Sequence, residues 1–272
     1  SETKSKCQVL CFISAIGGIG KTLAVYLFAE LLKKNNKRCA IVDLNKRYSD
    51  ILYYYPDKNL TKVKKSNLVE NSCFTDTFSD GGRQCIFHID NEIRNLEYQL
   101  FKIVLYQARL SQFDFVLIDT TVGDAELIDN IYPIVENLYC IITPDTATLL
   151  NTVELFGNLT RVSDSEKYRI NFICNMLDTQ RSDNDKTAEF INGFSGSEKI
   201  EIKNVIRLPY SQELKNIIGP VGVTADIFGS APVKTLEYFI SSNILNLNVS
   251  SATSSSLFGR ISALLKPKNA FK

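Results

Sequence analysis

Short apolar runs, separated by amphipathic or polar stretches, recur along most of the chain. They are rich in β-branched and aromatic residues, and several end in an acidic or amide side chain. Near-continuous apolar composition over such short lengths is typical of strands buried on both faces of a parallel sheet. The runs are CQVLCFISA (7–15), CAIVDLN (39–45), QCIFHID (84–90), FDFVLIDTTVG (113–123), NLYCIITPD (137–145), RINFICNML (169–177) and EIKNVIRLPY (201–210).

Helical periodicity fills some of the gaps between these runs. LAVYLFAELLKKNNKR (23–38) has apolar residues at helical spacing and basic residues at its C-terminal end, and NLEYQLFKIVLYQARLSQ (95–112) is amphipathic. Strands that alternate with helices indicate an α/β fold. We therefore predict a doubly wound, mostly parallel sheet of about 6–8 strands flanked by helices, with ligands at the carboxyl ends of the strands.

The C-terminal part of the chain differs in composition. Residues 1–245 are predicted to form one domain, and NLNVSSATSSS (246–256) is a Ser-rich linker that cannot bury enough apolar surface to fold alone. Residues 257–272 are predicted to form an amphipathic tail, which suits an anionic membrane surface. Docking of residues 257–268 on a protein scaffold or on the domain itself is the alternative. The apolar residues of the tail and the basic residues beside them are Leu257, Phe258, Ile261, Leu264 and Leu265, and Arg260, Lys266 and Lys268.

Composition and charge argue against several classes of protein. The 272 residues are 44% hydrophobic and 22% charged, which is ordinary for a globular protein. The 31 Lys and Arg residues nearly balance the 30 Asp and Glu residues, for a net charge of +1. This balance does not favour a nucleic-acid partner, although Lys62, Lys64 and Lys65 leave a local basic patch open. The single histidine, His88, argues against a His-based triad or zinc site.

Cysteine usage and the N-terminus bear on the compartment. The seven cysteines are odd in number and show no C-x-x-C spacing, which indicates a reducing compartment rather than a disulfide framework. The N-terminus is polar, and no apolar run approaches the roughly 20 residues of a membrane span. We therefore expect a cytoplasmic protein, attached peripherally at the inner face of the cell membrane if the tail binds lipid.

A glycine-rich loop follows the first apolar run. It ends in Gly20-Lys21-Thr22, as in the phosphate-loop pattern G-x-x-x-x-G-K-[ST], while Ala15 stands at the position of the first glycine. In such loops backbone N–H groups and the next helix N-terminus face the phosphates, the lysine reaches the β- and γ-phosphates, and the hydroxyl ligates Mg²⁺. A plain glycine turn would not need Lys-Thr at that position. We therefore predict that ATP and Mg²⁺ bind here, with nucleotide contacts from Gly17, Gly18, Ile19, Gly20, Lys21, Thr22 and Leu23.

Two of the next apolar runs contain an aspartate at the end of the predicted strand. Asp43 follows CAIV, and Asp119 follows FVLI in the arrangement known as Walker B. Such an aspartate reaches Mg²⁺, usually through a water, or senses the γ-phosphate. Either aspartate alone could be a helix N-cap or a turn former. Together, and in this order after the glycine loop, they predict a metal site formed by Thr22, Asp43 and Asp119.

With the loop and both aspartates located, the chain resembles the ParA/MinD family of deviant Walker A ATPases over roughly residues 7–240. The resemblance implies a homodimer in the ATP-bound state, an adenine contact from Asn175 and a flank of the base at Pro209. Within the family the chain looks most like the divergent TadZ/CpaE pilus-assembly and BcsQ/YhjQ cellulose-secretion members. The motifs concerned are IGGIGKT, CAIVDLN, FDFVLIDTTVG, CNMLD and RLPYSQELKNIIGPVG.

The chain departs from the family pattern at two positions. The signature lysine that reaches the phosphates of the partner subunit is replaced by Ile16, and the aspartate that orients the attacking water is replaced by Asn45. An amide can hydrogen-bond a water, but it has no negative charge and is a poor proton acceptor. We therefore predict intact binding and slow hydrolysis, with Lys21, Asp43, Asn45 and Asp119 as the catalytic set.

The sequence leaves more than one function open. The first is a nucleotide-dependent dimeric organiser that localises a membrane-associated secretion, pilus or polysaccharide machine. The alternative is a DNA- or plasmid-partition ATPase of the ParA type, which salt-dependent binding to non-specific DNA would distinguish. A phosphoryl-transfer synthetase on the same scaffold is disfavoured, because the sequence shows no second group of residues for another substrate.

Overall fold

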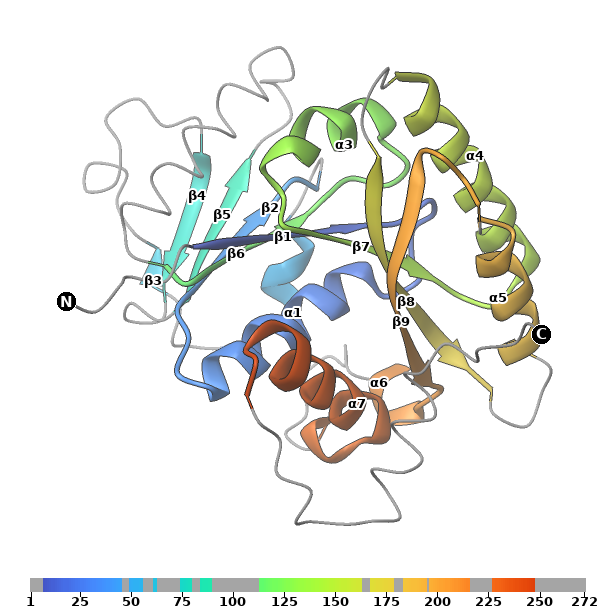
Figure 1. The fold of residues 1–272 in the computed structure, drawn as a ribbon. Helices are drawn as coiled ribbons and strands as arrows, with labels where there is room; N and C mark the ends of the chain where they lie inside the picture. Colours follow the sequence, from blue (N-terminus) through green and yellow to red (C-terminus); the bar gives the residue numbers. More distant parts are fainter. Residues whose placement is uncertain are drawn as a thin grey trace.

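A sheet of nine strands forms the centre of the computed structural model (Figure 1). The structure describes residues 7–45, 49–55, 61–62, 74–79, 84–89, 113–162, 167–178, 183–194, 196–215 and 227–247. The spatial order of the strands is β3-β4-β5-β2-β6-β1-β7-β8-β9, so neighbours in the sheet are often distant in sequence.

Seven adjacent strands of this sheet are parallel, which confirms the prediction of a mostly parallel α/β sheet. Two further strands, β3 (Thr61–Lys62) and β4 (Phe74–Ser79), are antiparallel and extend one edge. The sequence did not predict them, because one is very short and the other has polar residues at four of its six positions. The parallel strands are β5 (Gln84–Ile89), β2 (Cys39–Asp43), β6 (Phe115–Asp119), β1 (Gln8–Ile13), β7 (Asn137–Ile142), β8 (Tyr168–Leu177) and β9 (Ile200–Pro209).

Helices cover both faces of the sheet (Figure 1). On one face lie α1 and α7, which contact each other, and on the other lie α3 and α4, with α5 packed against β8. A short 3-10 helix follows β2 at Asp50–Tyr54, and Tyr54 stacks on Tyr26 of α1 with ring centroids 5.3 Å apart. The α-helices are α1 (Lys21–Lys34), α3 (Ala125–Ile131), α4 (Thr146–Val162), α5 (Asp183–Asn192), α6 (Gln212–Lys215) and α7 (Ala231–Phe239), and a π-helical turn, Ile240–Ile244, follows α7.

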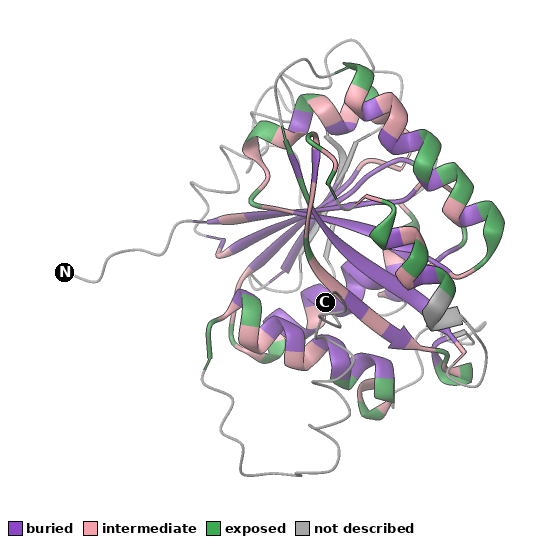
Figure 2. Ribbon diagram, turned by 45° about the vertical axis from the view of Figure 1, so that its right-hand side comes forward, coloured by how far each residue is buried: buried purple, intermediate pink, exposed green. Residues whose placement is uncertain are grey.

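Alternate residues of each central strand pack into different cores. In β1, Leu10 and Phe12 belong to the cluster beneath α1 and α7, whereas Val9, Cys11 and Ile13 belong to the cluster beneath α3, α4 and α5. Successive side chains of a strand point to opposite faces, so a strand between two helical layers must be apolar at every position. Figure 2 shows the result: the central strands are buried, and exposed residues lie on the outer sides of the helices.

The chain reverses its direction across the sheet at β1. From β1 it passes through α1 to β2, two places away on one side, whereas β6 leads through α3 to β7 on the other side of β1. In open α/β sheets such a switch point leaves a crevice at the carboxyl ends of the strands, where ligands bind. The glycine loop lies there, between β1 and α1.

Several predictions fall on residues that the structure does not describe. The helix predicted at 95–112, the lysines Lys64 and Lys65, and residues 248–272, which include the tail and most of the Ser-rich linker, lie outside the described residues. Among the described residues, no helix combines the length and apolarity needed to cross a bilayer.

Candidate functional site

The glycine loop adopts a backbone that suits glycine. Gly18 has φ 77° and Gly20 has φ 94°, in the left-handed region that favours residues without a Cβ. Gly20 also faces Asn175, because a Cβ built on it would lie 2.6 Å from the Asn175 side-chain nitrogen. Gly17 and Gly18 are exposed, whereas Ile19 and Leu23 are buried in the core beneath α1. The loop therefore presents its backbone to solvent while its apolar side chains anchor it.

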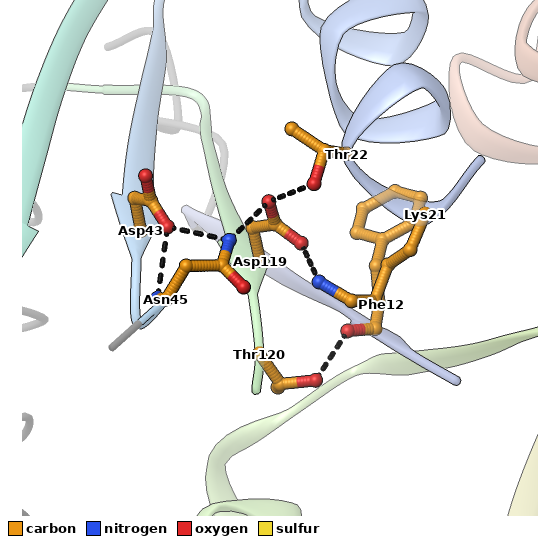
Figure 3. A network of polar contacts seen from close by, with 7 residues as sticks. All are labelled: Phe12, Lys21, Thr22, Asp43, Asn45, Asp119 and Thr120. Atoms are coloured by element: carbon orange, nitrogen blue, oxygen red, sulfur yellow. Dashed lines mark hydrogen bonds and ion pairs between the residues drawn. The ribbon is translucent and has the colours of Figure 1, made fainter. Parts of the chain in front are cut away.

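The first two residues of α1 point toward the end of β6 (Figure 3). The Lys21 ammonium pairs with Asp119 Oδ1, and the Thr22 hydroxyl donates to Asp119 Oδ2 at 2.8 Å. Lys21 is 6% exposed and Asp119 is fully buried, so the ion pair is shielded from solvent. These partners lie 98 and 97 residues apart in the sequence, and the structure brings them together at the end of β6. Their predicted roles in phosphate and Mg²⁺ binding stay predictions.

Asp43 and Asn45, after β2, complete this network. The backbone N–H of Asn45 donates to Asp43 Oδ1 at 2.9 Å, so Asp43 does form the local turn that the sequence left open as an alternative. The side-chain nitrogen of Asn45 donates both to Asp43 Oδ1, at 2.8 Å, and to Asp119 Oδ2, at 2.9 Å. Asp43 and Asp119 are aligned in the register between β2 and β6, which places both carboxylates at the same edge of the sheet.

Electrostatics at Asp119 reflect its burial. Loss of solvent raises the pKa of Asp119 above the ordinary carboxyl value, while the neighbouring Lys21 charge opposes this shift and Asp43 adds to it. Hydrogen bonds from Lys21 and Thr22 also favour the ionised form. The ionised carboxylate of Asp119 therefore depends on the donors that surround it.

The segment after β6 packs against the glycine loop. The Thr120 hydroxyl donates to the carbonyl oxygen of Phe12 at 2.8 Å, and the N–H of Gly123 donates to the carbonyl oxygen of Ser14 at 3.0 Å. Asp124 caps α3 by accepting from the N–H of Leu127 at 3.0 Å. Capping of this helix is thus done by Asp124, which leaves Asp119 oriented toward Lys21 and Thr22.

Asn175 lies behind the loop at the end of β8. Its side-chain nitrogen donates to the carbonyl oxygen of Ile19 at 2.9 Å, and its side-chain oxygen accepts from the N–H of Met176 at 2.9 Å. Both halves of the amide therefore have protein partners in this structure, and the predicted contact with adenine stays a prediction. Pro209 ends β9 opposite Leu177, and the N–H of Tyr210 donates to the carbonyl oxygen of Leu177 at 2.8 Å.

One further residue of the site, Ser14, was not singled out from the sequence. Ser14 is 1% exposed, directly precedes the loop, and its hydroxyl has no hydrogen-bond partner among the described residues. A hydroxyl directly after a mostly apolar strand and just before a glycine loop is the signal that could have identified it. A buried hydroxyl without a partner is costly, and an anion held by the loop is a suitable acceptor.

The residues present fit a nucleotide phosphate with Mg²⁺. The loop has the positive φ values and the small residues that let a backbone approach phosphate, and Lys21 supplies a buried positive charge at its end. Thr22, Asp43 and Asp119 offer oxygen ligands, which Mg²⁺ prefers.

Comparisons with known proteins identify the fold of this chain, but no match in sequence assigns it to a family. No protein-family model matches the chain, and no curated protein matches it. Many solved structures do match. The ParA family ATPase from Chlorobium tepidum TLS superposes with a TM-score of 0.63 at 19% identity, covering 88% of this chain and 99% of that chain. The chain has the fold of the ParA/MinD family ATPases.

Two other structures with the ParA/MinD fold were solved with bound nucleotide. The putative plasmid partition protein from Borrelia burgdorferi B31 bound to AMPPNP gives a TM-score of 0.62 at 12% identity, covering 89% of this chain and 100% of that chain. The septum site-determining protein MinD complexed with Mg-ADP from Pyrococcus horikoshii OT3 gives a TM-score of 0.59 at 13% identity. The match covers 88% of this chain and 97% of that chain. The ParA/MinD fold thus spans nearly the full length of these relatives.

Proposed function

We propose that this chain is an ATP-binding, weakly hydrolysing ATPase of the ParA/MinD type. The observation that supports this most strongly is the convergence of Lys21, Thr22 and Asp119 below a glycine loop at the switch point of the sheet. Structures of this fold solved with AMPPNP and with Mg-ADP are consistent with the same ligand class. The proposal places one ATPase domain in residues 1–245, followed by the linker and the tail.

Each residue of the site has a proposed task. The backbone N–H groups of the loop and the N-terminus of α1 would hold the phosphates, with Lys21 exchanging its Asp119 partner for the β- and γ-phosphates. Thr22, Asp43 and Asp119 would hold Mg²⁺, directly or through water, and the ion would neutralise charge on the phosphate oxygens. Asn175 and Pro209 would border the base, as the resemblance to the family implies.

Slow hydrolysis follows from the two departures in this site. Ile16 offers no positive charge to the phosphates of a second subunit, and it is partly buried against the core beneath α1. Asn45 has an amide where a carboxylate would orient water, and its nitrogen is already engaged with Asp43 and Asp119. Neither residue can supply the transition-state charge or proton acceptance that efficient phosphoryl transfer requires.

The cellular role we propose is a nucleotide-dependent dimeric organiser that positions a membrane-associated secretion, pilus or polysaccharide machine. The resemblance to the TadZ/CpaE and BcsQ/YhjQ proteins supports this role. A plasmid-partition role is the second candidate, favoured by the fold shared with the Borrelia burgdorferi partition protein. Binding to non-specific DNA with a steep salt dependence would favour partition over organisation.

Binding, assembly and turnover can be measured together on the full chain. We expect ATP·Mg²⁺ to bind in calorimetry, to shift the mass seen by light scattering from monomer to dimer, and to be hydrolysed far more slowly than the ~10 s⁻¹ of a typical enzyme. ADP·Mg²⁺ is the control for assembly. Absence of any ATP binding would refute the proposed function, and turnover on the order of 10 s⁻¹ would refute the slow-hydrolysis part alone.

The tail gives a separate prediction. Five apolar side chains at roughly 1.5–3 kcal/mol each are offset by ordering about ten residues at a similar total cost, so one copy should bind lipid weakly. Two copies in a dimer would bind much better through effective concentration. We therefore expect ATP to increase co-sedimentation with anionic liposomes, and removal of residues 257–272 to abolish it. Equal sedimentation of the full-length and truncated chains would instead direct the search to a protein partner.

A further inference from the structure

One side-chain nitrogen connects the two aspartates of the site. Asn45 Nδ2 lies 2.8 Å from Asp43 Oδ1 and 2.9 Å from Asp119 Oδ2, so its two N–H bonds are directed at two different carboxylates (Figure 3). Both neighbours accept hydrogen bonds, so the amide must present its nitrogen, and not its oxygen, to them. The amide thus bridges Asp43 and Asp119 from the loop after β2.

The bridge matters because the carboxylates of Asp43 and Asp119 lie on neighbouring strands and are shielded from solvent. Asp43 and Asp119 are register partners on adjacent strands, and both are fully buried. Like charges in a poorly solvated site repel strongly unless positive groups lie between them. The Lys21 ammonium pairs with Asp119 Oδ1, whereas the Asn45 side chain donates hydrogen bonds to Asp43 Oδ1 and to Asp119 Oδ2. The amide hydrogens therefore occupy the place where a shared cation would otherwise be most favourable.

We propose that Asn45 acts as a built-in substitute for the divalent cation. Its amide keeps Asp43 and Asp119 assembled when no metal is bound, and it must turn away before Mg²⁺ can take the same oxygens. Asn45 is a positioning residue that weakens metal binding to the protein alone, which makes Mg²⁺ entry depend on the phosphates that arrive with it. The inference rests on the proposed function for its physiological meaning, but its test does not require nucleotide.

The substitution Asn45→Asp separates this role from a general structural one. An aspartate has no N–H to donate, so it replaces the bridge with a third carboxylate beside two buried ones. The variant should then require a cation that the parent does not. In EDTA its melting temperature should fall by at least roughly 2–4 °C relative to the parent, and Mg²⁺ should restore most of this loss. The parent should respond little to Mg²⁺ alone.

Metal binding gives a second, direct readout. Mn²⁺ binding to the nucleotide-free full chain, followed by electron paramagnetic resonance, should be at least about tenfold tighter in Asn45→Asp than in the parent, because oxygen ligands and negative charge raise affinity for hard cations. Asn45→Ala removes the bridge without adding charge. It should also lose stability in EDTA and recover with Mg²⁺, and it remains informative if Asn45→Asp does not fold.

The matched control is Asn151→Asp, the same chemical change on the exposed side of α4, where the Asn151 side chain donates to its own helix at the carbonyl oxygen of Ala147. It should show no Mg²⁺-dependent change in melting temperature. The inference is overturned if Asn45→Asp and Asn45→Ala are as stable as the parent in EDTA, or if Mg²⁺ does not restore them. If the two Asn45 variants show these metal effects but the parent never binds ATP, the proposed function is refuted and the role of Asn45 stands.

Discussion

Lys21→Ala is expected to abolish detectable ATP·Mg²⁺ binding and to destabilise the protein. Lys21 is 6% exposed, and its ammonium pairs with the fully buried Asp119. Removing one partner of a buried ion pair leaves an uncompensated charge and costs about 3–5 kcal/mol. The same substitution removes the positive charge at the end of the phosphate loop. Calorimetry with ATP·Mg²⁺ and thermal unfolding of the parent and the variant measure the two effects.

A double variant separates these two effects. In the double variant Lys21→Ala, Asp119→Asn, the carboxylate that would lack its partner is replaced by a neutral amide. Most of the thermal stability should therefore return, while ATP binding stays lost. Lys34→Ala is the control on the same helix, since Lys34 is exposed and pairs with Glu237 at 2.5 Å. An exposed pair is worth about 0–1 kcal/mol, so this variant should bind and unfold like the parent. If Lys21→Ala binds ATP·Mg²⁺ as well as the parent, the site is not a phosphate loop.

Gly20→Ala is expected to have the next largest effect. Gly20 has φ 94°, where any other residue costs roughly 1–3 kcal/mol, and its Cβ would come within 2.6 Å of the Asn175 nitrogen. Asn175 is itself held by the carbonyl oxygen of Ile19, so relief of the contact would disturb the loop. We expect a clear loss of thermal stability together with at least about a hundredfold loss of ATP affinity, by analogy with a geometric misplacement at a site.

Gly18→Ala provides the matched comparison. Gly18 also has a positive φ, 77°, but a Cβ built there meets nothing within 4 Å among the described residues. This variant should therefore show only the backbone cost and a smaller loss of affinity. Equal losses for Gly18→Ala and Gly20→Ala would show that the contact with Asn175 is not important for the loop.

The apolar pattern by itself determined the layered α/β architecture of this protein. Every position of CAIVD is buried in β2, and every position of FVLID is buried in β6. A strand covered by helices on both faces has no solvent-facing residues, so an uninterrupted apolar run is enough to predict that the strand is buried. The glycine loop could also be predicted from the sequence, because its backbone conformation requires glycine and because a strand and a helix flank it.

Tertiary structure alone decided which side chains meet. Nothing in the spacing of Asn45 and Asp119 along the chain shows that one amide bridges two aspartates, since that contact arises from the pairing of β2 with β6. The same holds for Asn175: the resemblance to the family implies a contact with the base, and only the structure shows that its side chain donates to the carbonyl oxygen of Ile19. Local periodicity records how a residue is buried, whereas its partner depends on strand order and register, which sequence-distant segments set together.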